Sequence, residues 1–368
     1  MKHVVVKLGR LALSLGALYG VLLALAWALV PREAADQPID TSRAADTLYL
    51  TEPKYVFMAR QRLRSSAPKL LLLGASNTMA GFKPRELGPL LPELEVHNLA
   101  IGGANLTEVR QVAELVREVQ TPANKRQTTY VIGLWYGLFA SDAVRWQTPD
   151  RHAGDTDIDI ERYRYDFYRR TAEGPQPVVP APYLRSAETL VLPYLALDRL
   201  ARDLTESLRA RLSGKPPKLS DAERNARVID LDEQRKYLAF WRAYMGPETR
   251  LDEAQLEQLR ALVATLSADG SHVVLVDLPI PRWHAQGSSL AADYRERMRR
   301  VAPELAALPG VSWLAMADPS HDDGQQFSDE VHPKPRVTRV WAKRLAEGLH
   351  GLPASVSVTT PTASNDHG

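Results

Sequence analysis

The stretch Lys69-Leu70-Leu71-Leu72-Leu73-Gly74-Ala75-Ser76 decides the fold, because it joins an uninterrupted apolar run to a glycine and a serine. A short apolar run without polar alternation is typical of a strand that is buried on both faces, as in a parallel sheet. The glycine permits a tight turn at the end of that run. The stretch therefore predicts a central strand that leads directly into a helix.

The same alternation of strand and helix returns along the chain. Further strands are expected at 94–99, 128–134, 271–277 and 311–316, and helices at 82–91, 106–119, 251–266, 290–308 and 336–349. Strands that alternate with helices imply right-handed crossovers and a doubly wound parallel sheet. We therefore predict an α/β fold with about five parallel strands, in the flavodoxin-like class of strand order.

The N-terminal segment 11–30 (LALSLGALYGVLLALAWALV) contains no charged residue. At about 1.5 Å of rise per residue, a helix of this length crosses a hydrocarbon core of roughly 30 Å. Lys2, Lys7 and Arg10 precede it and favour a cytoplasmic N-terminus. We predict a single-pass inner-membrane anchor with a periplasmic, extracytoplasmic body. A cleavable signal peptide is the alternative, since Ala24-Leu25-Ala26 resembles a cleavage site.

The rest of the chain divides by composition. We expect an anchor at 1–30, a polar stalk or linker at 31–66, one catalytic-type domain at 67–350, and a Ser-, Thr- and Pro-rich disordered tail at 351–368. A mainly helical insertion at 140–245 separates the third strand from the fourth. A connection of this length at the edge of a sheet is expected to form a lid or substrate surface, with a purely structural cap as the alternative.

Composition excludes several classes of function. The 368 residues carry a formal net charge of only +2, which disfavours a broad nucleic-acid-binding surface. The chain has no cysteine, so disulfides, thiolate nucleophiles and cysteine-based metal sites are excluded. The 9 histidines are scattered, with no pair at the spacing of metal ligands. We therefore predict no metal site and no cofactor.

In open α/β sheets, ligands bind beyond the carboxyl ends of the strands. Polar or small residues follow several of the predicted strands at these ends. Ser76 follows the first strand and begins a helix, so its hydroxyl should lie near backbone N–H groups that can stabilise an oxyanion. A simple helix-capping role is the alternative. Gly102 and Gly103 follow the second strand, and glycines let the backbone approach a ligand closely.

The segment Asp329-Glu330-Val331-His332-Pro333 precedes the last helix. A carboxylate three residues before an imidazole can fold back on it, fix its tautomer and stabilise the imidazolium. Asp318 and His321 have the same spacing, so spacing alone does not identify the pair. Position favours Asp329 and His332, because they lie directly before the helix.

These stretches together resemble the SGNH, or GDSL-like, hydrolase family. Gly74-Ala75-Ser76 is similar to its first block, with Ala75 where the family more often has Asp. The segments 98–103 and 329–333 are similar to its second and last blocks, so the resemblance covers roughly 67–140 and 250–350. It implies catalytic roles for Ser76, His332 and Asp329, with oxyanion N–H groups from Ser76 and from Gly103 or Gly102.

The third block departs from the family pattern. The family usually has Gly-x-Asn after the third strand, whereas this chain has Gly133-Leu134-Trp135-Tyr136-Gly137 and no Asn. The loss of one oxyanion donor costs roughly 3 kcal/mol in another hydrolase. Asn77, Asn105 or Tyr136 are candidate substitutes for this donor. A slower reaction, or a subfamily with a different oxyanion hole, would equally account for the departure.

Further candidates for substrate contact lie near the strand ends. Trp135 and Tyr136 follow the third strand, Asn105 follows the paired glycines, and Arg282 and Trp283 follow the fourth strand. Trp283 is a candidate for stacking on a sugar, and Arg282 for holding an anionic group. Each also has an ordinary structural interpretation.

The anchor and the departure in the third block resemble the membrane-anchored SGNH proteins of cell-envelope acylation, which include the D-alanyl-lipoteichoic acid protein. The resemblance implies a serine-dependent O-acyltransferase or O-acetylesterase that acts on an envelope or exported polysaccharide, beside a membrane-bound O-acyltransferase. A general extracytoplasmic ester hydrolase is one alternative. A catalytically degenerate glycan-binding or scaffold protein is the second.

Overall fold

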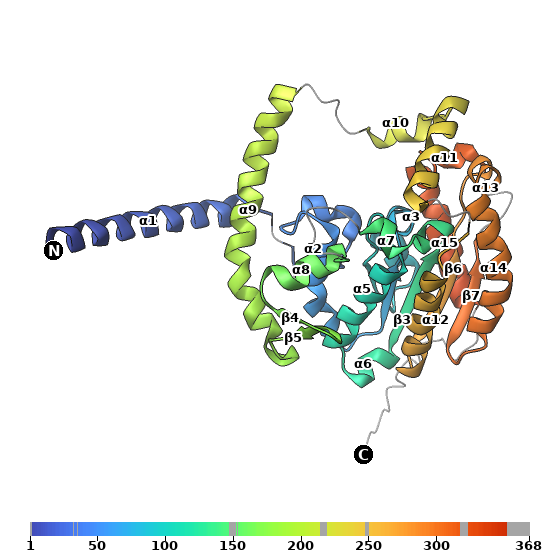
Figure 1. The fold of residues 1–368 in the computed structure, drawn as a ribbon, viewed down its shortest axis with the longest axis horizontal. Coiled ribbons are helices and arrows are strands. Elements are labelled where there is room, and N and C mark those ends of the chain that lie inside the picture. Colours follow the sequence, from blue (N-terminus) through green and yellow to red (C-terminus); the bar gives the residue numbers. More distant parts are fainter. Residues whose placement is uncertain are drawn as a thin grey trace, which may run out of the picture.

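The computed structural model describes residues 2–31, 33–34, 36–146, 152, 154–213, 219–246, 250–316 and 323–351. Figure 1 shows a long N-terminal helix that projects from a body in which helices surround one sheet. The predicted disordered tail beyond Gly351 and the alternative pair Asp318–His321 lie outside the described residues.

Five parallel strands form the central sheet. They are β1 (Lys69–Leu73), β2 (Glu95–Asn98), β3 (Thr128–Leu134), β6 (His272–Asp277) and β7 (Val311–Ala315). Their order is β2-β1-β3-β6-β7, with β1 paired to both β2 and β3. The predicted α/β fold with about five parallel strands is confirmed, and each predicted strand begins within one residue of its predicted start.

Helices follow the strands as predicted. Those around the sheet are α3 (Ser76–Gly81), α4 (Pro84–Leu87) with the 3₁₀ turn η3 (Gly88–Leu90), α5 (Leu106–Val119), α6 (Pro122–Arg126), α12 (Glu253–Ala268), α13 (Arg282–Gly287), α14 (Ser289–Ala306) and α15 (Pro335–His350). The expected 106–119 helix matches α5 in full, because its apolar residues recur at helical spacing. Short 3₁₀ turns, η4 (Tyr136–Phe139) and η6 (Gly324–Gln326), follow β3 and precede the last helix.

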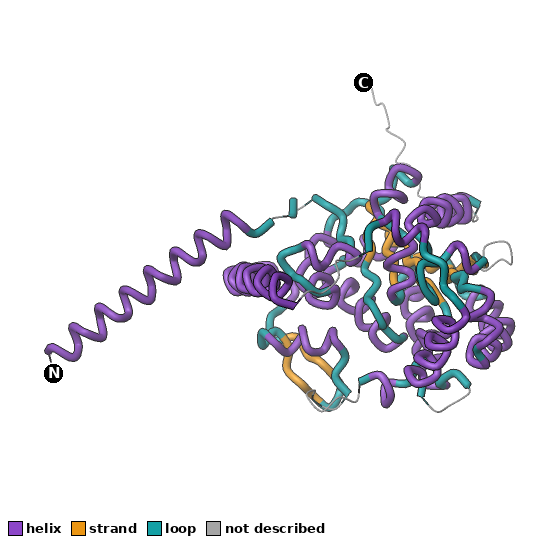
Figure 2. The backbone as a smooth tube through the Cα atoms, turned by 90° about the horizontal axis from the view of Figure 1, so that it is seen from above, coloured by secondary structure: helices purple, strands orange, loops and turns teal. Residues whose placement is uncertain are grey.

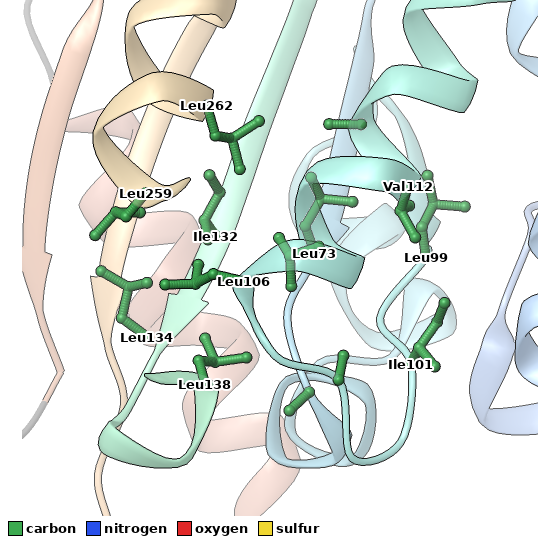
Figure 3. Packing of buried hydrophobic residues seen from close by; sticks show 14 of the residues in the cluster. Leu73, Leu99, Ile101, Leu106, Val112, Ile132, Leu134, Leu138, Leu259 and Leu262 are labelled. Atoms are coloured by element: carbon green, nitrogen blue, oxygen red, sulfur yellow. The ribbon is translucent and has the colours of Figure 1, made fainter. Parts of the chain in front are cut away.

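Apolar side chains pack on both faces of the sheet. Leu71 and Leu73 of β1 belong to the larger core cluster, whereas Leu70 and Leu72 belong to the smaller one on the other face. Figure 3 shows residues of the larger cluster, with Leu262 of α12 close to Ile132 of β3. Alternate residues of one strand thus bury their side chains in two different cores, which explains the uninterrupted leucine run.

The segment predicted as a stalk packs into the body. It contains η1 (Thr41–Asp46), α2 (Glu52–Ala59) and η2 (Arg60–Arg64), and Tyr55, Val56 and Phe57 are at most 1% exposed. The backbone N–H of Asn98 at the end of β2 donates to the carbonyl of Ile39 at 2.8 Å. Polar composition alone did not indicate this, because the apolar residues of α2 lie within a charged stretch.

The insertion between β3 and β6 is mainly helical, as expected, and also contains a hairpin. Its helices are α7 (Asp142–Arg145), α8 (Asp157–Arg164), η5 (Ala181–Tyr183), α9 (Leu184–Ser213), α10 (Asp221–Ala226) and α11 (Leu231–Met245). The hairpin pairs β4 (Tyr168–Thr171) with β5 (Gly174–Pro177). Two arginines in β4 and two prolines in β5 obscure the strand pattern, and a two-stranded ribbon tolerates such residues at its edges.

The helix α1 (Lys2–Leu29) is long and apolar enough to cross a membrane, with a mean hydropathy of 2.0 over its most apolar window. Only its C-terminal end packs against the body, where Ala26 and Val30 contact α9. This is consistent with an anchor or a signal sequence.

Candidate active site

A tight turn between β1 and α3 positions Ser76. Gly74 has a φ of +145°, and a Cβ there would lie 2.3 Å from Oγ1 of Thr78. Gly133 of β3 is crowded by the same hydroxyl, at 2.2 Å. The two glycines therefore let Thr78 pack beneath the turn. Ser76 is the first residue of α3 and is half-buried, and its N–H belongs to a first turn that has no intrahelical acceptor.

The predicted pair Asp329 and His332 is formed. Nδ1 of His332 lies 2.8 Å from Oδ2 and 2.9 Å from Oδ1 of Asp329. Oδ1 also accepts the backbone N–H groups of Val331 at 3.0 Å and of His332 at 2.8 Å. These bonds hold the carboxylate against the ring. A proton on Nδ1 leaves Nε2 as the acceptor, which is the tautomer that a general base requires.

The pairing lowers the pKa of Asp329 and raises the pKa of His332. Burial alone would lower the pKa of His332, but the hydrogen bond and the negative charge of Asp329 outweigh it and raise that pKa above 6.5. Burial alone would raise the pKa of Asp329, but its bonds to His332 and to the backbone lower that pKa below 3.8. A raised imidazole pKa matches a group that takes a proton and returns it.

A polar cleft of about 640 Å³ contains Asp329 and His332. Its other walls come from α3, α4, α10 and α15, including Ala80, Lys83, Asp221, Arg224 and Arg336. Ser76 lies one helical turn before Ala80, on the same face of α3. No hydrogen bond joins Ser76 to His332 among the described residues, so the completed triad stays a prediction.

The paired glycines lie beside the turn that carries Ser76. The N–H of Ile101 donates to the carbonyl of Gly74 at 3.0 Å, so the loop after β2 runs alongside the end of β1. Gly103 has a φ of +70°, and its carbonyl accepts from Nε of Arg145 at 2.7 Å and from the hydroxyl of Tyr244 at 2.8 Å. The insertion thus holds the peptide of Gly103 in one orientation, which the sequence did not predict.

The two asparagines proposed as substitute donors have different surroundings. Oδ1 of Asn77 accepts the N–H of Thr78 at 2.9 Å, while its buried Nδ2 has no partner among the described residues. Asn105 caps α5, and its amide donates to the carbonyl of Ala140 at 3.0 Å and to Asp142 at 2.7 Å. Asn105 is therefore occupied by structural bonds, whereas Asn77 retains an unused donor.

Tyr136, the third candidate, is part of a buried chain of hydrogen bonds. Its hydroxyl lies 2.5 Å from Nε2 of His284, and Nδ1 of His284 lies 2.7 Å from the carbonyl oxygen of Glu330. The carboxylate of Glu330 accepts from Nε1 of Trp241 at 3.3 Å. Glu330 directly follows Asp329, so these hydrogen bonds connect the loop of Asp329 and His332 to η4, α13 and α11. Sequence reasoning missed His284, which has no motif around it.

Burial keeps His284 neutral. Burial lowers its pKa to about 4, although the carbonyl of Glu330 and the charge of Asp329 act in the opposite direction. Burial likewise raises the pKa of Tyr136 well above its usual range. Both groups are neutral near pH 7, so the hydrogen bond between them does not depend on charge.

The remaining candidates do not share the cleft of His332. Trp135 is buried and packs edge-on against Trp241, with 4.6 Å between ring centroids. Arg282 and Trp283 line a separate cleft of about 710 Å³ with residues of η6 and the start of α11. Substrate contact by these residues stays a prediction, and the burial of Trp135 gives it a structural role.

No family model matches the chain, and no curated protein matches it. Among the described residues, no three His, Asp or Glu side chains gather into a metal site. The function of the site is therefore inferred from the positions and contacts of its residues.

We expect the Asp329→Asn variant to lower the pKa of His332 by removing the charge that raises it. The wild-type imidazole should titrate above pH 6.5, and the variant below the wild-type value. NMR titration of histidine-labelled protein measures both, with the His332 signal assigned by its loss in His332→Gln. The Asp232→Asn variant is the matched control, since Asp232 is exposed and distant in the sequence from the pair. Equal pKa values in wild type and Asp329→Asn would contradict the pairing.

We expect Tyr136→Phe to destabilise the fold by about 1–3 kcal/mol, because it leaves buried Nε2 of His284 without a partner. Urea denaturation measures the change in the free energy of unfolding. Tyr183→Phe is the control, since Tyr183 is 65% exposed and should change stability little. Equal stability of both variants would show that the bond between Tyr136 and His284 contributes nothing.

Proposed function

We propose that this chain is a membrane-anchored, SGNH-type serine enzyme that transfers or removes an ester-linked acyl group on a cell-envelope or exported polysaccharide. The observation that carries the proposal is the Asp329–His332 hydrogen bond of 2.8 Å in a polar cleft. Ser76 lies one turn before the part of α3 that lines this cleft. The order of the three residues along the chain and the parallel sheet support the same proposal.

The proposed reaction has two steps. His332 accepts the proton of Ser76, and Oγ of Ser76 attacks the carbonyl carbon of the ester. The bond to the leaving alcohol breaks, and His332 gives that alcohol its proton. An acceptor hydroxyl or water then attacks the acyl-Ser76 ester, His332 takes the new proton, and Ser76 recovers it as the acyl group leaves. Asp329 holds the ring and stabilises its positive form throughout.

Backbone N–H groups are the proposed oxyanion donors. Those of Ser76 and Gly103 are the first choice, with Gly102 as the alternative. The unused Nδ2 of Asn77 supports this residue as the replacement for the missing asparagine of the third block. It lies next to Ser76 in the chain, although it is buried beneath the turn.

The walls of the cleft support a hydrated acceptor such as a glycan. Lys83, Arg85, Arg224, Arg336 and Arg339 line it, with Glu86 and Asp221 opposite in charge. Such a lining hydrogen-bonds hydroxyl-rich or anionic groups and is a poor environment for a lipid chain. The helix α1 would place the enzyme at the inner membrane, where a membrane-bound O-acyltransferase is the proposed donor of the acyl group. The proposed reaction requires no cofactor.

One observation favours a second candidate, an inactive glycan-binding or scaffold protein. Trp135 and Tyr136 are buried where the family has its oxyanion asparagine. A chain that had lost catalysis would retain the cleft and the anchor. A general extracytoplasmic ester hydrolase is a third candidate, which differs from the first in acting on esters other than those of a polysaccharide.

Activity toward p-nitrophenyl acetate separates the enzyme from the binder. We expect Ser76→Ala and His332→Ala to lower kcat by at least about 10³-fold, because each removes a member of the proton relay. The full chain in detergent micelles is assayed by release of p-nitrophenolate. His321→Ala is the control and should retain the wild-type rate. Identical rates in wild type and both site variants would refute the catalytic proposal for this class of ester.

An acceptor experiment separates transfer from hydrolysis. With an acyl donor and an oligosaccharide acceptor, we expect wild type to form acylated oligosaccharide, because a polar cleft should retain the acceptor beside the acyl-enzyme. Mass spectrometry detects the added acyl mass, and Ser76→Ala should yield none. Free acid without acylated sugar would assign the chain to the hydrolases.

A further inference from the structure

The helix α9 has a continuous apolar stripe on its exposed surface. The stripe consists of Leu190, Tyr194, Leu197, Leu204, Leu208 and Leu212. Each follows the previous one by 3, 4 or 7 residues, so all six point in nearly the same direction. Five of them are highly exposed, with Leu190 at 77% and Leu212 at 78% at the two ends. A stripe this long on one helix marks a surface that has a partner.

The opposite face of α9 holds the helix to the body. Glu188 is buried and pairs with Arg60 at 2.8 Å, and Leu195 belongs to the main core cluster. The guanidinium of Arg199 donates to the carbonyls of Ala45 at 2.6 Å and Thr47 at 2.9 Å. Residues 188, 195 and 199 lie on one side at spacings of seven and four. The apolar stripe therefore faces away from the body.

The membrane-length helix α1 meets α9 crosswise. Ala26 and Val30, in the last turn of α1 and just after it, pack against Ala196 of α9. In Figure 1 α1 runs across the long axis of α9, and Figure 2 shows α9 nearly end-on while α1 extends away from it. If α1 crosses a bilayer, α9 must then lie along the bilayer surface at the level where α1 emerges.

We propose that α9 is an interfacial helix that inserts its apolar stripe into the outer surface of the bilayer spanned by α1. Trp27 near the end of α1 and Tyr194 within the stripe are exposed aromatic residues, which are typical of the headgroup level. Arg185, Arg202 and Arg209 lie outside the stripe and are exposed, where they can contact anionic headgroups.

Lipid fits this surface better than a second copy of the chain. The stripe passes the end of α1, whose own leucines are exposed along its length, because the stripe residue Leu197 packs against Ala26, Val30 and Ala196. Residues 201, 202, 204–209 and 212 of α9 are exposed and Asp203 is half-buried, so the body does little to stabilise this part of the helix. A bilayer at the level of α1 supplies the missing apolar environment for it without another protein.

The chain has no cysteine, so single-cysteine variants report one position each. Leu204→Cys and Leu208→Cys sample the stripe. Arg202→Cys and Glu206→Cys sample the opposite side of the same two turns, and all four positions are exposed. Each variant of the full chain, with α1 verified by intact mass, is labelled with an environment-sensitive fluorophore. It is then reconstituted in vesicles of three parts phosphatidylcholine to one part phosphatidylglycerol.

Lipids with a nitroxide near the headgroup end of the acyl chain quench only labels that enter the bilayer. We expect roughly threefold stronger quenching at 204 and 208 than at 202 and 206, because interfacial helices bury their apolar face ~5–10 Å deep. Aqueous iodide should show the reverse order. Equal lipid quenching at all four positions would overturn the proposal. Protection of 204 and 208 from both quenchers would also overturn it, in favour of a protein partner or a second copy.

Discussion

The constraint on which the rest depends is the complete enclosure of β1. This strand pairs with β2 on one edge and β3 on the other, and its side chains enter two separate cores. At the carboxyl end of β1 the chain must turn within this crowded environment. Gly74 and Gly133 make the turn possible, because their missing side chains leave room for Thr78. That turn sets the start of α3 and so the position of Ser76. The loop after β2 is bound to the same turn through Gly74.

The imidazole side of the site depends on a different kind of support. The loop of Asp329 and His332 contains no helix or strand. It is held in place by hydrogen bonds from His284 to the carbonyl of Glu330 and from Trp241 to the carboxylate of Glu330. Hydrogen bonds between buried groups strongly restrict the positions of their residues, because breaking one leaves an unpaired polar atom away from water. Tyr136, in the turn after β3, thus joins this part of the sheet edge to the loop of Asp329 and His332 through His284.

Sequence predicted the parts of this protein that depend on local pattern. The leucine run of β1, the helical period of α5 and the spacing of Asp329 and His332 are all patterns formed by residues that are close together in the sequence. The tertiary contacts were not predictable in this way. The packing of α2 into the core depends on burial, while the amide bonds of Asn105 to Ala140 and Asp142 and the bond between Tyr136 and His284 join residues that are 35 or more positions apart. Single-sequence patterns carry no information about such partners.

The cleft and the apolar stripe of α9 are suited to different surroundings. A polar cleft suits a hydrated substrate, whereas the stripe of α9 needs an apolar surface within reach of α1. Both come from the same insertion, since α10 lines the cleft and α9 carries the stripe. A helix that fixes the body against a bilayer would also fix the direction in which α10 and the cleft face. Orientation by α9 would then replace the free rotation that a single membrane helix allows, and would hold the cleft at a constant height above the lipid.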